Sequence, residues 1–188
     1  MAYLLRSARY LSHDVLKETV QPGDTVIDAT MGNGHDTLYL CELVGEDGRV
    51  IAFDVQAQAV ESTRQRLAEN NMLDRATLYC KGHQHMDEAG VQDVAAIVFN
   101  LGWLPGGDKS VTTLWETTKV ALEKALSLLK KHGVLLLCAY PGHAEGDRER
   151  SEVMKFLASL PPQQYNVLHQ RFLNAGPGAP ENFIIQKQ

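Results

Sequence analysis

A glycine-containing turn between an apolar segment and a helical segment is the first feature that could do chemistry. Asp28 lies in the apolar segment, and the turn that follows contains Gly32 and Gly34. Glycine lets the backbone approach a ligand that a Cβ atom would repel, and open α/β sheets bind cofactors beside such turns. We expect a nucleotide-type cofactor to be bound here by Asp28, Thr30, Gly32, Asn33, Gly34, Asp36 and Thr37.

The same turn resembles motif I of class I methyltransferases, D/E-x-G-x-G-x-G, with Thr30 in place of the first glycine. The dinucleotide pattern G-x-G-x-x-G fails at its third glycine, where this chain has Thr37. S-adenosylmethionine is therefore the expected cofactor. A nicotinamide dinucleotide is the weaker alternative, and a tight turn without a ligand is a third.

An acidic residue near the end of the next strand-like segment supports a nucleotide site. Asp54 can accept hydrogen bonds from both ribose hydroxyls of an adenosine. Gln56 can cap the following helix or touch the adenine. An isolated aspartate would more often be a solvated strand end, but the upstream glycine turn favours ribose binding.

Two further polar residues, His83 and Gln84, follow the third strand-like segment, where class I methyltransferases contact adenine. His83 and His85 would share one face of a strand, which raises the alternative of a zinc site. Two histidines without an acidic or cysteine partner nearby are a weak metal signal, so no metal is predicted.

The segment after the fourth strand-like run decides the reaction. Residues 100–109 read Asn-Leu-Gly-Trp-Leu-Pro-Gly-Gly-Asp-Lys. The start of this run resembles the N/D-P-P-Y/F motif of amine methyltransferases, in which a polar side chain and a carbonyl bind the amine and an aromatic ring stacks on the acceptor. Asn100 and Trp103 hold the first and fourth positions, whereas Leu101 and Gly102 replace the prolines. A mobile Gly-Pro loop is the alternative.

Methyl transfer from a sulfonium needs an aligned lone pair, and positioning supplies much of the rate. A primary amine must also lose a proton, for which Asp108, His83 and His143 are candidate bases without a ranking. Tyr140, on the same rim, either stacks on a base or lies in the core. The predicted substrate-binding residues are Leu101, Gly102, Lys109 and Tyr140.

Strand-like and helix-like segments alternate along the chain. Runs rich in apolar and β-branched residues predict strands over 25–30, 49–55, 76–81, 94–100 and 134–140. Apolar residues at helical spacing predict helices over 35–44, 56–71, 112–131 and 145–160, after an amphipathic segment over 3–20. This alternation implies parallel β-α-β units in an open, doubly wound sheet.

The last segment breaks the alternation. Strand-like runs over 165–173 and 182–186 are joined by a Gly/Pro-rich loop with no room for a helix, which predicts a hairpin and one antiparallel strand at the end of the sheet. The predicted fold is a single Rossmann-like α/β domain of the class I methyltransferase type. Its seven-stranded sheet is mostly parallel, with helices on both faces.

Composition agrees with one globular domain. The chain has 188 residues, 44% of them hydrophobic and 22% charged, close to the averages for globular proteins. The longest apolar run, 134–140, is far shorter than the roughly 20 residues that cross a bilayer, and no secretory signal is evident, so we expect a cytoplasmic protein. Cys41, Cys80 and Cys138 are expected to be buried, reduced thiols.

Together these motifs resemble one family closely, the bacterial tRNA 5-(aminomethyl)-2-thiouridine methyltransferases (the MnmM or YtqB-like group), also labelled rRNA methylases. The matching pieces are 29–37, 100–109, and 140–143 with Gly146, and the likeness runs from about residue 8 to the C-terminus. The resemblance implies transfer of a methyl group from S-adenosylmethionine to the aminomethyl nitrogen of the wobble uridine in certain tRNAs. It also implies contact with the anticodon region and a homodimer.

Rival hypotheses remain open. They are a small-molecule N-methyltransferase, an rRNA methyltransferase, an NAD-dependent oxidoreductase and a non-catalytic nucleotide-binding or scaffold protein. A net charge of −5 gives no global attraction for nucleic acid, so DNA is not expected and RNA needs a local basic patch. An RNA substrate would be favoured if one face gathered Arg6, Arg9, Lys81, Lys109, Arg148 and Arg150.

Overall fold

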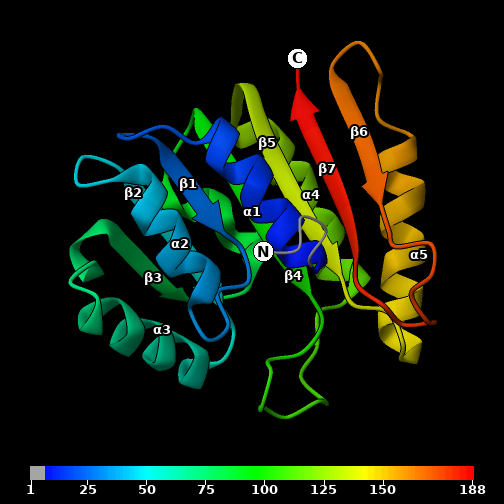
Figure 1. The fold of residues 1–188 in the computed structure, drawn as a ribbon, viewed down its shortest axis with the longest axis horizontal. Helices are drawn as coiled ribbons and strands as arrows, with labels where there is room; N and C mark the ends of the chain where they lie inside the picture. Colours follow the sequence, from blue (N-terminus) through cyan, green and yellow to red (C-terminus); the bar gives the residue numbers. More distant parts are fainter. Residues whose placement is uncertain (1–6) are drawn as a thin grey trace.

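The computed structural model describes residues 7–188 as a seven-stranded sheet with helices on both faces (Figure 1). The strands are β1 (Thr25–Asp28), β2 (Arg49–Asp54), β3 (Ala76–Cys80), β4 (Val94–Leu101), β5 (Leu129–Ala139), β6 (Tyr165–Gln170) and β7 (Glu181–Lys187). The helices are α1 (Ala8–Thr19), α2 (His35–Val44), α3 (Ala57–Glu69), α4 (Trp115–Leu128) and α5 (Ala144–Ala158), with short 3₁₀ segments η1 (Leu73–Arg75) and η2 (His83–Ala89).

The sheet has the order β3-β2-β1-β4-β5-β7-β6, which confirms the predicted fold class. Strands β1 to β5 are parallel, and β7 runs antiparallel to both β5 and β6. The hairpin is therefore present as predicted, but its last strand lies inside the sheet and β6 forms the edge. The order reverses beside β1, and this switch point opens a crevice at the carboxyl ends of the strands.

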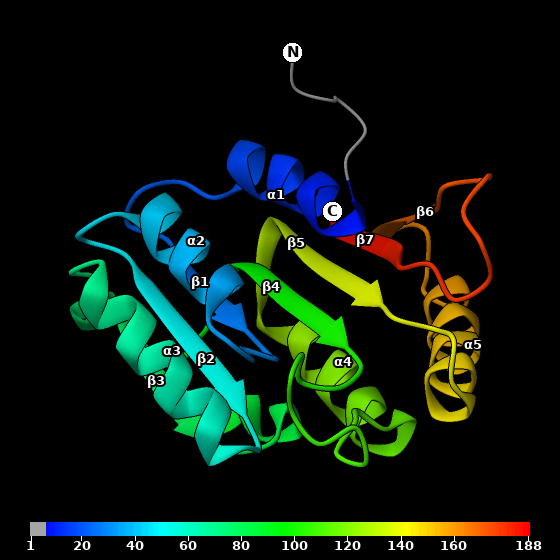
Figure 2. The same ribbon diagram turned by 60° about the horizontal axis from the view of Figure 1, so that its bottom comes forward.

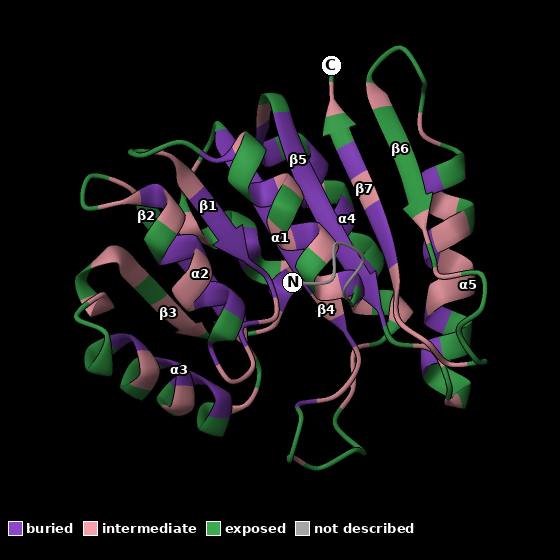
Figure 3. Cartoon of the chain, in the orientation of Figure 1, coloured by how far each residue is buried: buried purple, intermediate pink, exposed green. Residues whose placement is uncertain are grey.

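Helices lie on both faces of the sheet (Figure 2). Each face packs against its helices through a large apolar core. One core joins the sheet to α1, α2 and α3, and the other joins it to η2, α4 and α5. The central strands β4 and β5 are buried along most of their length (Figure 3) because helices cover both of their faces. The face of α3 predicted from helical spacing, Ala59, Val60, Thr63 and Leu67, is buried as expected.

The predicted helix over 112–131 was too long at both ends. Thr112 forms an isolated bridge with Trp103, and Leu129 already pairs with Val94 as the first residue of β5. His132 has a positive φ of 64° close to where the register of the two strands shifts. Apolar spacing continues across this helix-to-strand junction, so the sequence pattern did not mark it.

Burial of the cysteines was predicted correctly at two positions. Cys41 and Cys138 are buried, and burial raises the pKa of each thiol to about 12. The prediction for Cys80 was wrong, because β3 is an edge strand and its last side chain is exposed. The start of the predicted N-terminal segment and Arg6 lie outside the described residues. Across residues 7–188, no helix has both the length and the apolar character needed to span a bilayer.

Candidate active site

Two adjoining pockets open at the carboxyl ends of the parallel strands. The β2-side pocket, of about 280 Å³, lies beside Asp54, Gln56 and the start of η2. The β5-side pocket, of about 390 Å³, lies beside Arg9, Asp36 and Tyr140. They share a wall made of Thr30, Gly32, Asn100, Gly102, Trp103 and Pro105. The glycine turn and the segment after β4 therefore meet at one site.

The two glycines of the turn have different roles. Gly32 has a φ of +51° and lines both pockets, so it is placed where the predicted cofactor contact requires it. Gly34 lines neither pocket. A Cβ at Gly34 would lie 2.8 Å from the Cα of Thr63, so this glycine permits close packing of α3.

Asp28 and Thr37 form buried hydrogen bonds behind the glycine turn. Asp28 is fully buried and accepts hydrogen bonds from the Thr37 hydroxyl at 2.7 Å and the Thr30 amide at 3.2 Å. Neither Asp28 nor Thr37 lines a pocket, so their predicted contact with the cofactor is at most indirect. Burial raises the pKa of Asp28 to about 7, and the nearby Asp36 carboxylate adds to the rise.

Asp28 should make folding stability depend on pH. Because its folded-state pKa lies above the usual value for an aspartate, the stability that Asp28 contributes is present at low pH and is lost as pH rises towards 7. We expect Asp28→Asn to gain roughly 2 kcal/mol relative to the wild type between pH 5 and 8. Urea unfolding of both proteins across this range measures the difference, and parallel profiles would contradict it.

Asp54 is placed as predicted, at the end of β2 and facing the β2-side pocket. Its carboxylate accepts hydrogen bonds from the amides of Gly32 at 3.0 Å and Gln56 at 2.9 Å. Burial raises the pKa of Asp54, and these two hydrogen bonds only partly offset the rise. Each carboxylate oxygen accepts only one of these bonds and can accept another. Gln56 and Gln84 line the same pocket.

His83 and His85 do not share a face, because the structure places them in η2 and not in a strand. His83 is 7% exposed, lies at the β2-side pocket and packs against Phe99. Burial lowers its pKa to about 4, so His83 is neutral at pH 7. His85 is exposed and pairs with Glu88. Among residues 7–188, no group of His, Cys, Asp or Glu side chains could hold a metal ion.

Asn100 lies at the shared wall in a defined orientation. Its side-chain nitrogen donates to Asp36 Oδ2 at 2.8 Å, and its backbone amide donates to the Thr30 hydroxyl at 2.7 Å. The other oxygen of Asp36 accepts from Arg9 at 2.7 Å and pairs with His13 at 2.8 Å. Burial alone would raise the pKa of Asp36, but His13 and Arg9 hold it at about 2. An ionised Asp36 is only an acceptor, so the amide oxygen of Asn100 is left for another donor.

The loop after β4, residues 102–114, stands out from the sheet edge (Figures 1 and 3). Asn33 donates to the Pro105 carbonyl at 3.2 Å and so joins the glycine turn to this loop. Trp103 faces both pockets, and the Lys109 ammonium lies 5.4 Å from its ring centroid. The loop is thus held at its base, which argues against a freely mobile segment.

Two predicted residues of this region lie outside the pockets. Leu101 is 2% exposed and belongs to the core. Asp108 is exposed and accepts two hydrogen bonds from Ser110, which lower its pKa. Neither residue lines a pocket, so the structure gives Leu101 no substrate contact and Asp108 no reach to a bound amine.

The segment after β5 completes the β5-side pocket. Tyr140 is 37% exposed and lines this pocket, so its ring does not lie in the core, and stacking on a base stays a prediction. His143 packs against Trp103 with ring centroids 4.3 Å apart. Its Nδ1 accepts from the Gly146 amide and caps α5, so the proton of the neutral ring is on Nε2. That tautomer donates hydrogen bonds and cannot take a proton at Nε2.

Two residues near the site were missed from the sequence. Arg9 was noted only as a surface cation, yet α1 brings it into the β5-side pocket. Glu149 of α5 is 2% exposed and accepts hydrogen bonds from Thr113 and Thr118, both at 2.6 Å. Since the Thr113 amide also donates to the Gly102 carbonyl, Glu149 fixes the end of the 102–114 loop. No local motif marks a contact between residues 36 positions apart.

Loss of the Thr113 hydroxyl should therefore weaken the fold. We expect Thr113→Val to lower the free energy of unfolding by about 1–3 kcal/mol, because it removes a donor from a buried carboxylate. Thr117→Val is the matched control, since the exposed Thr117 hydroxyl bonds only the Leu114 carbonyl of its own turn. Urea unfolding compares the two variants, and equal losses would contradict the role of Glu149.

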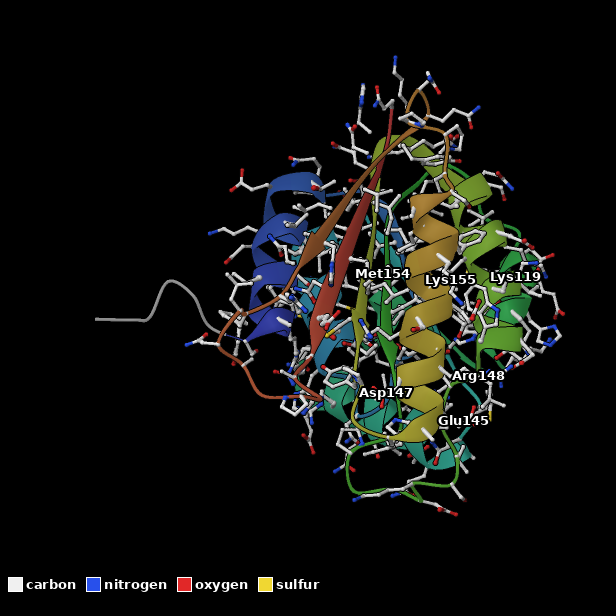
Figure 4. The ribbon with its side chains drawn as sticks, turned by 90° about the vertical axis from the view of Figure 1, so that its right-hand side faces the viewer. Lys119, Glu145, Asp147, Arg148, Met154 and Lys155 are labelled. Carbon is white, nitrogen blue, oxygen red and sulfur yellow. The ribbon has the colours of Figure 1, made fainter. Side chains whose placement is uncertain are left out.

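The six basic residues that were to test for an RNA face do not behave alike. Lys81 pairs with Glu88, Arg150 pairs with Glu181, and Arg148 pairs with Glu116 at 2.6 Å. Arg148 lies on α5, on the opposite side of the sheet from α1 (Figure 4). Of the five that the structure describes, Arg9 and Lys109 are placed at the β5-side pocket, the first as a lining residue and the second over Trp103.

The sheet order and the crevice at its switch point define the class I methyltransferase fold. A family model described as "Putative rRNA methylase" matches residues 50–186. The chain therefore belongs to this family. A solved protein of the same description from Clostridium thermocellum is 41% identical, with a TM-score of 0.97 over 99% of this chain and 100% of that chain.

Two further relatives bear on the site. A "putative methyltransferase" from Streptococcus mutans, solved in complex with SAH, is 36% identical with a TM-score of 0.90, over 98% of this chain and 100% of that one. The chloroplastic tRNA (mnm(5)s(2)U34)-methyltransferase of Arabidopsis thaliana is 38% identical over 185 residues, 90% of this chain. The aligned part is 65% of the length of that relative.

Proposed function

We propose that this protein is an S-adenosylmethionine-dependent N-methyltransferase that acts on tRNA. Its acceptor would be the aminomethyl group of 5-aminomethyl-2-thiouridine at the wobble position. The observation that carries the proposal is the wall shared by the two pockets, where Asn100 faces both. The name of the Arabidopsis relative supports the choice of tRNA and of position 34.

The β2-side pocket fits the cofactor. Gly32 leaves the backbone bare at the pocket, where a Cβ would lie 3.5 Å from the Leu104 side chain. Asp54 would accept hydrogen bonds from the ribose, and Gln56, His83 and Gln84 would surround the adenine. His83 suits an adenine contact because it is neutral. When bound, the cofactor supplies an electrophilic methyl group on a sulfonium.

The β5-side pocket fits a base that carries an amine. Tyr140 and Trp103 offer aromatic faces for stacking, as RNA-binding proteins do for unstacked bases. The Asn100 oxygen, freed by the bond between its amide nitrogen and Asp36, would accept an N–H of the amine. The hydrogen bond between the amine and Asn100 would orient the nitrogen lone pair towards the cofactor in the β2-side pocket.

Among the described residues, neither His143, Asp36 nor Asp108 is suited to act as a general base at the acceptor. His143 has its available nitrogen protonated, Asp36 has a pKa of about 2, and Asp108 lies outside the pocket. The amine would therefore enter as its neutral fraction and release its second proton to solvent after transfer. Positioning by Asn100 would supply most of the rate.

Mass spectrometry of tRNA nucleosides tests the proposal. tRNA that carries 5-aminomethyl-2-thiouridine is incubated with the protein and deuterium-labelled methyl donor. The expected product is the labelled methylaminomethyl nucleoside, and tRNA without the aminomethyl group is the control. Label in a different nucleoside, in rRNA only or in a small amine only would refute the assignment. We also propose that the protein forms a homodimer and contacts the anticodon region, as the family resemblance implies.

A further inference from the structure

Two cations stand at the mouth of the β5-side pocket without an acidic partner. Arg66 of α3 donates to the Asn33 carbonyl at 2.7 Å and lies 3.2 Å from His35 Nε2. Lys109 lies over Trp103. Neither cation has a carboxylate within ion-pair distance among residues 7–188. Both contact residues that line the pocket, Asn33 and His35 for Arg66 and Trp103 for Lys109.

Two other cations, one on α3 and one on α4, have carboxylate partners. Arg64, on α3 with Arg66, pairs with Glu61. Lys119, on the side of the sheet away from α1 (Figure 4), pairs with Glu123. The uncompensated charge of Arg66 and Lys109 is notable in a chain whose net charge is −5. Arg66 and Lys109 therefore place two positive charges without a carboxylate partner beside residues that line the β5-side pocket.

The pKa of His35, at the same pocket, is affected by nearby positive charge. His35 is exposed, lines the β5-side pocket and begins α2. Burial lowers the pKa of His35, and the charges of Arg66 and Arg9 lower it further. The N-terminus of α2 adds the positive end of a helix dipole, although Asp36 is in its first turn.

We propose that Arg66 and Lys109 bind phosphates of the RNA strand on either side of the nucleotide whose base enters the β5-side pocket. The two cations come from separate elements, α3 and the 102–114 loop, so a strand can run between them across the pocket mouth. Cations flanking aromatic faces are the combination that binds single-stranded RNA. The inference rests on the proposed function, because it assumes that the acceptor base is part of RNA.

Fluorescence anisotropy with a labelled anticodon stem–loop RNA tests the surface over a range of salt concentrations. The variants are Arg66→Gln, Lys109→Gln and the double variant. Arg64→Gln and Lys119→Gln are the matched controls, since each removes one paired cation. Arg66→Lys keeps the charge at position 66, and Lys109→Gln removes a side chain that makes no hydrogen bond or ion pair among residues 7–188 and contacts only the Trp103 ring there. Calorimetry with SAH shows whether the β2-side pocket is intact in each variant.

The double variant is expected to bind the RNA about tenfold more weakly, with unchanged SAH affinity. The slope of log K against log salt should become shallower by about 0.7 for each cation removed. Arg66→Lys should keep the wild-type slope. Wild-type slopes in the double variant, equal losses in the controls, or full competition by uridine 5′-monophosphate would overturn the inference.

The same data separate this inference from the proposed function. RNA methylation by the wild type, together with unchanged RNA affinity in the double variant, would reject the phosphate surface and keep the function. RNA binding that depends on both cations, without methylation of any RNA, would reject the function and keep the surface.

Discussion

Replacing Asn100 by alanine is expected to slow methyl transfer about a hundredfold, because the amine loses the acceptor that orients its lone pair. Cofactor affinity should change by less than about threefold, since the residues that we propose to contact the adenosine lie elsewhere in the β2-side pocket. Single-turnover kinetics with saturating tRNA measure the first effect, and calorimetry with SAH measures the second. Unchanged turnover would remove Asn100 from the catalytic account.

A second variant separates the orientation of Asn100 from its presence. Asp36→Asn leaves Asn100 in place but replaces an acceptor-only partner with an amide that also donates. The Asn100 amide could then turn, and we expect a loss of rate of about tenfold with SAH affinity retained. A wild-type rate in Asp36→Asn would show that the Asn100 orientation does not matter.

Replacing Asp54 by alanine is expected to weaken cofactor binding by about a hundredfold. Two hydrogen bonds to a charged acceptor, each of roughly 1.5–3 kcal/mol, exceed the 2.8 kcal/mol or so that this change requires. The amides of Gly32 and Gln56 also lose their acceptor, so Asp54→Asn, which keeps the shape of the side chain, is the companion variant. Calorimetric titration measures both, and near-normal binding by Asp54→Ala would contradict the ribose role.

The pH dependence of cofactor affinity gives an independent check on Asp54. Burial raises its pKa, so the carboxylate is protonated at a higher pH than an ordinary aspartate. Affinity should therefore fall as pH is lowered through that raised pKa, and Asp54→Asn should lack this step. The same titrations with NAD should show no binding by the wild type.

Local patterns were sufficient to predict the sheet and the position of the crevice. Alternating segments specify parallel units, and the glycine turn and Asp54 follow consecutive strands, so the cofactor residues meet at one edge. The same patterns could not separate Gly32, which lines both pockets, from Gly34, which accommodates Thr63. That difference depends on how α3 packs against the turn.

Contacts between distant residues account for most of what the sequence did not predict. The orientation of Asn100 depends on Asp36, 64 positions away, and Asp36 in turn depends on Arg9 from α1. The cap of α5 makes His143 Nε2 a donor. This tautomer could not be predicted from the residue type alone, because it depends on the hydrogen bond from Gly146. Residue type predicted only part of the pocket lining, since Leu101 and Asp108 lie outside it and Arg9 was missed, and the chemical role of each residue depended on its partners.

The internal position of β7 determines when the enzyme can become active during synthesis. Asn182 of β7 donates to the Ala8 carbonyl of α1 at 2.6 Å, and β7 fills the space between β5 and β6. The helix that carries Arg9, α1, can therefore complete its packing against the sheet only after residues 181–187 have left the ribosome. We therefore expect nascent chains that still lack β7 to have an incomplete β5-side pocket and to be inactive in methylation.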